Sequence, residues 1–400
     1  MNAGSVEPIV IIGGGAAGHA CAEAYRRAGG SDPVVIISNE DRLPYFRPDL
    51  SKDVLAGEKN AADDLAEQSW FADHDVTVRL GTTVSRIDTE RRTIVLAASD
   101  HQAPETIAWS QCLLAPGSSA TRLPVPGGDD DRLLTIRGAA DVERVIAASA
   151  HGSSVVIVGS GFIGCEAASS LRSRGLEVTM LSLEIQPQQD RLSDVVGELI
   201  NGLLARAGVE FHGGETVEAF EFSDDSATVV AGGGHRFAAD HILVASGAKT
   251  NTAVAEASGL EIVAGGVHVD SSMRSNVEGL FVAGDLAYAD NVTAGRALRV
   301  EHWGDAETMG SIAGRVMAGE AAVWESVPGF WSTINGETLQ YIAWGDGWDE
   351  VAARRSEEGL SVWYAKHGTI VGVLTHRHDD DQELGKTLIS TGAALADLHW

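Results

Sequence analysis

One pattern occurs twice in this 400-residue chain and constrains its fold more than any other feature. The first copy runs from Pro8 to Glu40 (PIVIIGGGAAGHACAEAYRRAGGSDPVVIISNE), and the second from Ser154 to Glu184 (SVVIVGSGFIGCEAASSLRSRGLEVTMLSLE). Each copy reads as an apolar strand, a glycine-rich turn, an alanine-rich helix and a second apolar strand that leads to a glutamate. Continuous apolar strands are typical of parallel sheets that are covered on both faces. Two such βαβ units predict two nucleotide-binding domains, one inserted in the other.

Both turns have the GxGxxG spacing of a dinucleotide-binding loop, and each follows a strand and opens a helix. The glycines are Gly13, Gly15 and Gly18 in the first turn, and Gly159, Gly161 and Gly164 in the second. Glycine lets the backbone approach a pyrophosphate, and the helix that follows offers free amides at the positive end of its dipole. The sequence therefore predicts a dinucleotide at each turn.

An acidic residue follows the second strand of each repeat. Ser38 and Glu40 in the first copy match Ser182 and Glu184 in the second. Both glutamates are expected to accept hydrogen bonds from a ribose hydroxyl. At the second site Glu184 favours NADH, while the nearest downstream arginine, Arg191, leaves NADPH open.

The segments around the repeats complete a four-part organisation. Alternating runs typical of antiparallel strands follow each repeat. A helix is predicted over Val195 to Gly208, and another from about Asp305 to Met317, after the strand-like run GLFVAGDLA. The composition changes from about Glu325, where further alternating runs predict a small α+β domain. The predicted segments are 1–118 and 247–324 for the first domain, 119–246 for the inserted domain and 325–400 for the C-terminal domain.

Composition excludes several classes of function. A formal net charge of −28 disfavours general binding to nucleic acid or to an anionic membrane. The three cysteines form no CxxC or CxxxxC pair, so a disulfide framework and a thiolate zinc site are not expected. No basic region followed by a long apolar run is found at the N-terminus, and we predict a cytoplasmic protein.

The segment THRHDDD, Thr375 to Asp381, contains two histidines and three aspartates, residue types that could bind a metal. His376 and His378 stand two residues apart and lack the helical HxxxH spacing of a metal site. The sequence predicts a solvated loop or hairpin turn there, and no metal.

The most specific motif is PYFRPDLSK, Pro44 to Lys52. With it, the whole chain resembles the FAD- and NAD(P)H-dependent disulfide-reductase superfamily. The likeness is to ferredoxin reductases of the putidaredoxin-reductase and oxygenase-reductase type, and to the related apoptosis-inducing-factor flavoproteins. PYFRPDLSK matches the PYxRPxLSK signature of that branch, GSGFIGCE its GGGxIGxE and LFVAGD its second FAD motif, while VEHWGDAETMG and VPGFWS resemble two later segments.

The resemblance implies a fold and two cofactors. It implies an α/β chain with two Rossmann-like, glutathione-reductase-like dinucleotide-binding domains and a small α+β C-terminal domain. The first domain would bind FAD and the inserted domain NAD(P)H. Three matching positions would touch FAD: Gly284 and Asp285 at the ribityl or pyrophosphate region, and Trp303 against the isoalloxazine.

The resemblance also implies roles for three charged residues. Arg47 and Lys52 would line the flavin, with Lys52 close to its reactive nitrogen, and Glu166 would pair with Lys52 and help to order the nicotinamide. A fixed lysine stabilises the negative charge of a reduced flavin, and a buried lysine needs a partner. Catalytic roles are implied for Lys52, Glu166 and Trp303.

The expected function is an FAD-dependent reductase that takes a hydride from NAD(P)H and passes single electrons to a small ferredoxin-like protein, as in an oxygenase system. The segment PYFRPDLSKDVLAGE has no cysteine, so electrons would leave the flavin directly. The alternatives are a slow NADH-responsive flavoprotein of apoptosis-inducing-factor type, an NAD(P)H oxidase that uses oxygen or a small oxidant, and a non-enzymatic Rossmann-fold binding module. A monomer or a homodimer is expected, and an acidic ferredoxin would need a local basic face on this acidic chain.

Overall fold

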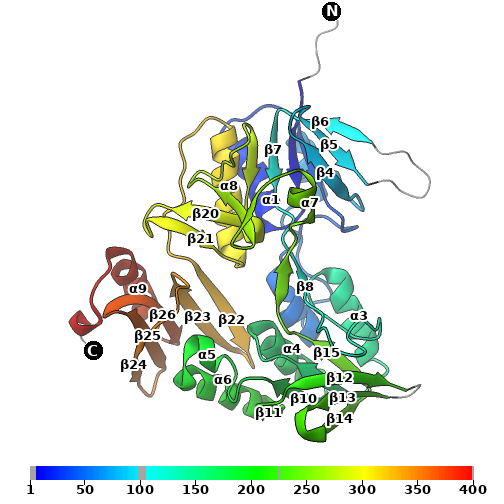
Figure 1. The fold of residues 1–400 in the computed structure, drawn as a ribbon, viewed down its shortest axis with the longest axis vertical. Helices are drawn as coiled ribbons and strands as arrows, with labels where there is room; N and C mark the ends of the chain where they lie inside the picture. Colours follow the sequence, from blue (N-terminus) through cyan, green and yellow to red (C-terminus); the bar gives the residue numbers. More distant parts are fainter. Residues whose placement is uncertain (1–5, 98–104, 224–225, 399–400) are drawn as a thin grey trace, which may run out of the picture. The chain divides into compact units, whose positions relative to one another are not determined.

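The computed structural model describes residues 6–97, 105–223 and 226–398, which form two compact units (Figure 1). The first unit comprises Met1–Phe46, Asp63–Ser118 and Thr250–Gly329. The second comprises Arg47–Ala62, Ser119–Lys249 and Phe330–Trp400. The four predicted segments stay a prediction, because a division into two units does not separate domains within one unit.

The first unit is built on a five-stranded parallel sheet with the order β19-β7-β1-β2-β3. Its strands are β1 (Ile9–Ile12), β2 (Val34–Ile37), β3 (Val76–Arg79), β7 (Gln111–Leu114) and β19 (Leu280–Val282). All four residues of β1 are buried, as its continuous apolar sequence predicts for a central strand.

Helices α1 (Ala16–Arg27) and α8 (Trp303–Met317) pack against each other in this unit. Gly310 and Gly314 of α8 lie so close to the α1 backbone that a β-carbon at either would collide with the carbonyl of Ala17 or Cys21. Helix α8 is the helix predicted from about Asp305 to Met317, and it begins two residues earlier, at Trp303.

Smaller elements complete the first unit. They are α2 (Gln68–Asp73), the antiparallel strands β4 (Val84–Asp88), β5 (Thr93–Leu96) and β6 (Thr106–Ala108), α7 (Ala253–Ala257), the 3₁₀ turn η4 (Gly284–Leu286), and the four-stranded sheet of β17 (Ile262–Val263), β18 (Gly266–Val269), β20 (Ala287–Asn291) and β21 (Arg296–Arg299). The chain passes between the units within two paired strands, β8 (Ser118–Ala120) and β16 (Ala248–Thr250).

The second unit repeats the same design around a four-stranded parallel sheet, β11-β10-β9-β15. The strands are β9 (Ser154–Val158), β10 (Glu177–Ser182), β11 (Glu210–Gly213) and β15 (His241–Val244), and the helices are α3 (Ala139–Ser149), α4 (Phe162–Ser173), α5 (Gln189–Leu192) and α6 (Asp194–Ala207). Helix α6 matches the predicted Val195 to Gly208 closely, and Gly208 follows it in a left-handed conformation that ends the helix.

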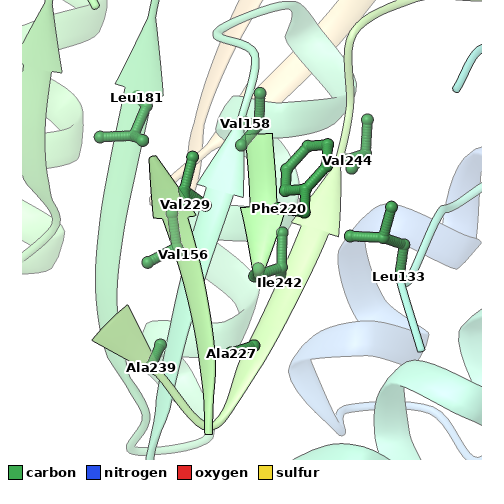
Figure 2. Close-up of a cluster of buried hydrophobic side chains, with 10 residues drawn as sticks. All are labelled: Leu133, Val156, Val158, Leu181, Phe220, Ala227, Val229, Ala239, Ile242 and Val244. Atoms are coloured by element: carbon green, nitrogen blue, oxygen red, sulfur yellow. The ribbon is translucent and has the colours of Figure 1, made fainter. Parts of the chain in front are cut away.

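A three-stranded antiparallel sheet covers one face of this parallel sheet. It contains β12 (Val217–Phe222), β13 (Ala227–Ala231) and β14 (Arg236–Ala239), with the 3₁₀ turn η3 (Gly232–Gly234) between the last two. Figure 2 shows the buried cluster between the two sheets, with Phe220 directed toward the side chains of the parallel strands. Strands β9, β13 and β15 each contribute two alternate residues to the cluster, as the two-residue period of a strand requires.

The motif PYFRPDLSK continues into unusual helical turns of the second unit. Arg47–Asp49 forms a 3₁₀ turn (η1), and Leu50–Val54 forms a single π-helical turn (η2). Lys52 departs from helical geometry inside η2, with φ −113° and ψ −107°. Leu50 begins this π turn, a type of turn that occurs often at functional sites.

The C-terminal segment forms a five-stranded sheet, β22-β23-β26-β25-β24, with a helix. Its elements are β22 (Gly329–Ile334), β23 (Glu337–Ala343), β24 (Glu350–Arg355), β25 (Leu360–Lys366), β26 (Thr369–His376), α9 (Asp379–Thr391) and the 3₁₀ turn η5 (Leu395–Asp397). The expected α+β content is present.

The prediction of a solvated loop or hairpin turn at Thr375 to Asp381 is wrong. His376 ends β26, and the three aspartates form the first turn of α9, where their charges favour the helix dipole. His376 and His378 are both buried and hydrogen-bonded, to Glu337 and to two serines respectively. Among the described residues, no group of His, Cys, Asp or Glu side chains could hold a metal ion.

The predicted fold class is confirmed: two α/β units each contain a parallel sheet with a glycine turn and helix after its first strand. Among the helices that the structure describes, none combines the length and apolar character needed to span a bilayer.

Candidate functional site

The three glycines of the first turn differ in what a β-carbon would meet at each position. Gly13 has φ +123°, and a β-carbon there would collide with the carbonyl oxygen of Ala115. A β-carbon at Gly18 would collide with the carbonyl oxygen of Gly13. At Gly15, by contrast, a β-carbon would meet no atom of the described residues within 4 Å. Packing within the protein therefore explains the first and third glycines, and leaves the second unexplained.

The second turn reproduces this arrangement. Gly159 has φ +107°, and a β-carbon there would collide with the Ala245 carbonyl, while one at Gly164 would collide with Gly159. At Gly161 the nearest atom would be Gln188 Nε2 at 3.7 Å, an ordinary van der Waals contact. Gly15 and Gly161 immediately precede α1 and α4, and neither helix has an acidic residue in its first turn. Both turns thus offer open space beside unshielded helix amides, which suits a pyrophosphate.

The acidic residues after each repeat are held by matching hydrogen bonds. The backbone N–H of Glu40 donates to Ser38 Oγ (3.2 Å), and that of Glu184 donates to Ser182 Oγ (3.1 Å). The Glu40 carboxylate accepts a hydrogen bond from the Tyr45 hydroxyl (2.7 Å). The Glu184 carboxylate accepts one from the backbone N–H of Asp190 (2.9 Å). Each carboxylate is thus held at the end of its strand.

Arg191, the arginine that leaves NADPH open, lies against aromatic rings. Its guanidinium carbon is 5.5 Å from the ring centre of Phe330 and 6.0 Å from that of Tyr341. Its carbonyl oxygen accepts a hydrogen bond from the Trp348 indole (2.9 Å). These contacts hold the backbone and the side chain of Arg191 against the C-terminal segment, at the loop residue Trp348 and at strands β22 and β23.

The second FAD motif of the sequence lies in the first unit. Gly284 has φ +68° and starts η4, which buries Asp285. Ser118 Oγ donates a hydrogen bond to Asp285 Oδ2 (2.5 Å). Trp303 contacts Phe46 edge to face, with ring centres 5.2 Å apart and an interplanar angle of 74°.

Lys52 and Glu166 come together in the second unit, although they are 114 residues apart. Lys52 Nζ lies 2.8 Å from Glu166 Oε2 and also donates to the Pro48 carbonyl (3.2 Å). The Lys52 side chain is 15% exposed and that of Glu166 only 2%. Arg47, from the same motif, donates to the Arg137 carbonyl (3.1 Å).

The carboxylate of Glu166 has two further donors that sequence reasoning missed. Ser51 Oγ donates to Oε2 (2.5 Å), and Ser332 Oγ donates to Oε1 (2.6 Å). Both serines belong to motifs already recognised, LSK and FWS, so a search of those motifs for small hydroxyl residues would have found them. A buried carboxylate with three donors satisfies the general requirement that a buried charge be paired and hydrogen-bonded.

None of the three cysteines is suited to redox chemistry. All are buried, at the first helix, the central sheet and helix α4. Burial raises the pKa of the Cys21 thiol to about 12 and also raises the pKa of Cys112 and Cys165. The reactive thiolate form is therefore disfavoured in this chain.

Comparison with known proteins assigns the chain to a family. A sequence profile of the pyridine nucleotide-disulphide oxidoreductases matches residues 7–310. The ferredoxin reductase component of chlorobenzene dioxygenase from Cupriavidus sp. (strain PS12) is 31% identical over 97% of this chain and 93% of its own length. Apoptosis-inducing factor 3 from Homo sapiens is 29% identical over 97% of this chain, which spans 64% of that protein's length.

A solved structure of a ferredoxin reductase is also similar to this chain. The ferredoxin reductase for the CYP199A2 system from Rhodopseudomonas palustris superposes with a TM-score of 0.89 at 26% identity, covering 97% of this chain and 96% of that one. The resemblance predicted from PYFRPDLSK and the two glycine turns is confirmed. The chain belongs to the pyridine nucleotide-disulphide oxidoreductase family and is similar to ferredoxin reductases of oxygenase systems.

Proposed function

We propose that this chain is an FAD-dependent reductase that takes a hydride from NADH and passes single electrons to a small ferredoxin-like protein of an oxygenase system. The observation that carries the proposal is the pair of open glycines, Gly15 and Gly161. Each lies at the start of a buried helix, and within the part of the chain that the structure describes no contact requires glycine there. Two separate dinucleotide sites suit an electron donor and a resident flavin. The names of the relatives support a ferredoxin as the acceptor.

The residues of the first unit fit FAD. The turn at Gly15 and the free amides of α1 would hold its pyrophosphate, and Glu40 would accept a ribose hydroxyl. Gly284 and Asp285 would contact the ribityl or pyrophosphate region, and Trp303 the ring. When bound, FAD accepts a hydride and releases the two electrons one at a time.

The residues of the second unit fit NADH. The turn at Gly161 and the amides of α4 would hold the pyrophosphate, and Glu184 would accept the adenine ribose hydroxyls. The Arg191 guanidinium lies over the rings of Phe330 and Tyr341, and we propose that it does not bind a 2′-phosphate. This arrangement supports NADH over NADPH.

Lys52 supplies the charge that the reaction needs. Among the described residues its ammonium has two partners, Pro48 O and Glu166 Oε2, which use two of its three N–H groups. The third is available to stabilise negative charge on the reduced flavin. Glu166 holds the ammonium in place and would help to order the nicotinamide, while Arg47 would line the flavin.

The state of the three cysteines bears on how electrons would leave the flavin. The cysteines are buried and their pKa values are raised, so a direct transfer to a one-electron carrier is the proposed route. We place the protein in the cytoplasm, as a monomer or homodimer, and its net charge of −28 argues against nucleic acid as a partner.

A second candidate function is a slow NADH-responsive flavoprotein. It is favoured by the 29% identity to apoptosis-inducing factor 3 over 97% of this chain. The two candidates differ in how fast the reduced protein gives up its electrons to a carrier.

Anaerobic stopped-flow reduction followed by mixing with an oxidised [2Fe–2S] ferredoxin tests the proposal. We expect a yellow protein that NADH bleaches, and that ferredoxin reoxidises much faster than oxygen does. Slow reoxidation by every protein carrier would support the second candidate. Equal rates with oxygen would favour an oxidase, and a preparation that binds no flavin even on reconstitution would overturn both.

A further inference from the structure

The carboxylate of Glu166 is held from two directions. Ser51 and Lys52, in the π turn η2, both bind Oε2. Ser332, in strand β22 of the C-terminal sheet, binds Oε1 at 2.6 Å. Ser332 is fully buried at 0% exposure, so this hydroxyl faces no competing water.

Helix α4 sets the position of Ser332 through a polar face. Glu166, Ser169 and Ser170 lie three and four residues apart, on one side of the helix. Ser169 Oγ accepts a hydrogen bond from the backbone N–H of Asn335 (2.8 Å), at the turn after β22. Phe330, at the other end of the strand, contacts Phe162 in the first turn of α4, with ring centres 4.9 Å apart. Strand β22 is thus held against α4 on both sides of Ser332.

The same face of α4 also holds η2, the π turn that contains Lys52. Ser170 Oγ donates to the carbonyl of Ser51 (2.8 Å), and Arg174, one turn further on, donates to the carbonyl of Val54 (3.1 Å). Both ends of the network that includes Lys52 are therefore anchored on one helix. The helix itself begins at the turn proposed to bind NADH.

We infer that Ser332 is a positioning residue for the Lys52–Glu166 pair. With Oε1 occupied by Ser332, the carboxylate cannot rotate without leaving a buried donor unpaired, so Oε2 stays directed at Lys52. Through Ser332 the C-terminal sheet thereby contributes to hydride transfer. This inference rests on the proposed function, because it assigns a role within the same site.

The test compares two serine substitutions. Ser332→Ala removes the hydroxyl on Glu166. Ser361→Ala is the matched control: Ser361 is also fully buried, lies in the same sheet and donates to a carboxylate, that of Asp381. Each variant is loaded with FAD, and the measurements are its thermal midpoint, the NADH dissociation constant, the limiting rate of flavin reduction and the flavin midpoint potential.

We expect Ser332→Ala to lower the limiting reduction rate about tenfold and to change the NADH dissociation constant less than threefold. Looser placement of the ammonium also weakens stabilisation of the reduced flavin, so its potential becomes more negative. A tenfold loss of that stabilisation corresponds to about 30 mV for two electrons. Ser361→Ala should lower the thermal midpoint by as much as Ser332→Ala does. It should leave the rate of flavin reduction and the flavin midpoint potential at their wild-type values.

Ser332→Cys keeps the shape and a weaker donor, and should fall between wild type and alanine; it also serves if the alanine variant fails to fold. Wild-type rate and potential in both Ser332 variants would overturn the positioning role and leave the proposed function standing. Equal effects of Ser332→Ala and Ser361→Ala would also overturn it. A wild-type protein that NADH does not reduce would overturn both.

Discussion

Replacing the open glycine of the turn proposed to bind NADH should weaken binding of the ligand and leave the fold intact. Gly161 has φ −63° and ψ 170°, which alanine adopts without strain, and its β-carbon would have 3.7 Å to the nearest atom. Alanine is a poorer N-cap than glycine by about 0.5–1 kcal/mol, and it restricts the unfolded chain by about 0.4–1 kcal/mol. These opposing effects leave the free energy of unfolding within about 1 kcal/mol of wild type.

The effect on binding should be larger. A methyl group at Gly161 points into the space where the pyrophosphate must approach the α4 amides. Loss of one hydrogen bond to a charged group costs about 1.5–3 kcal/mol, which corresponds to about 10- to 100-fold weaker binding. Isothermal titration with NAD⁺ measures this change, while the FAD content should stay unchanged.

Gly164→Ala is the matched control, because its β-carbon would collide with the Gly159 carbonyl. That variant should lose stability and binding together. The reasoning would be refuted if Gly161→Ala, shown to be folded, bound NAD⁺ as tightly as wild type. It would equally be refuted if Gly161→Ala lost as much stability as Gly164→Ala. In the first unit, Gly15→Ala should behave in the same way, with lost FAD instead of lost NAD⁺.

Three further outcomes are expected. Lys52→Ala should slow flavin reduction at least tenfold with little change in NADH affinity, because its charge acts on the reduced state; unchanged stopped-flow kinetics would contradict that role. Glu184→Ala should narrow the preference for NADH over NADPH in kcat/KM, and an unaltered ratio would remove Glu184 from the ribose site. Because burial raises the pKa of Cys21 to about 12 and raises that of the other two thiols, the native protein at pH 8 should not react with Ellman's reagent. Denaturation should expose three thiols, and loss of activity on alkylation of the native protein would contradict the direct route.

The sequence by itself determined the two nucleotide units. A strand, a GxGxxG turn, a helix and a second strand are encoded within about thirty residues, and local sterics set their order. Gly13 and Gly159 have a positive φ, and Gly18 and Gly164 lie against the carbonyls of Gly13 and Gly159. These requirements act within six residues, so the GxGxxG spacing of the sequence already predicts them. The motif PYFRPDLSK likewise led to the family, because its spacing is unusual and specific.

Only the tertiary structure decided which polar groups meet. Glu166 and Ser332 are 166 residues apart, and no local pattern encodes their contact; it arises because β22 packs on α4. The same is true of Arg191, whose contacts with Phe330 and Tyr341 are encoded by no local pattern. Buried hydrogen bonds depend on partners brought together by the whole fold, whereas turns and helices depend on neighbours in the chain. That difference explains why the nucleotide units could be predicted and the network around Lys52 could be predicted only in part.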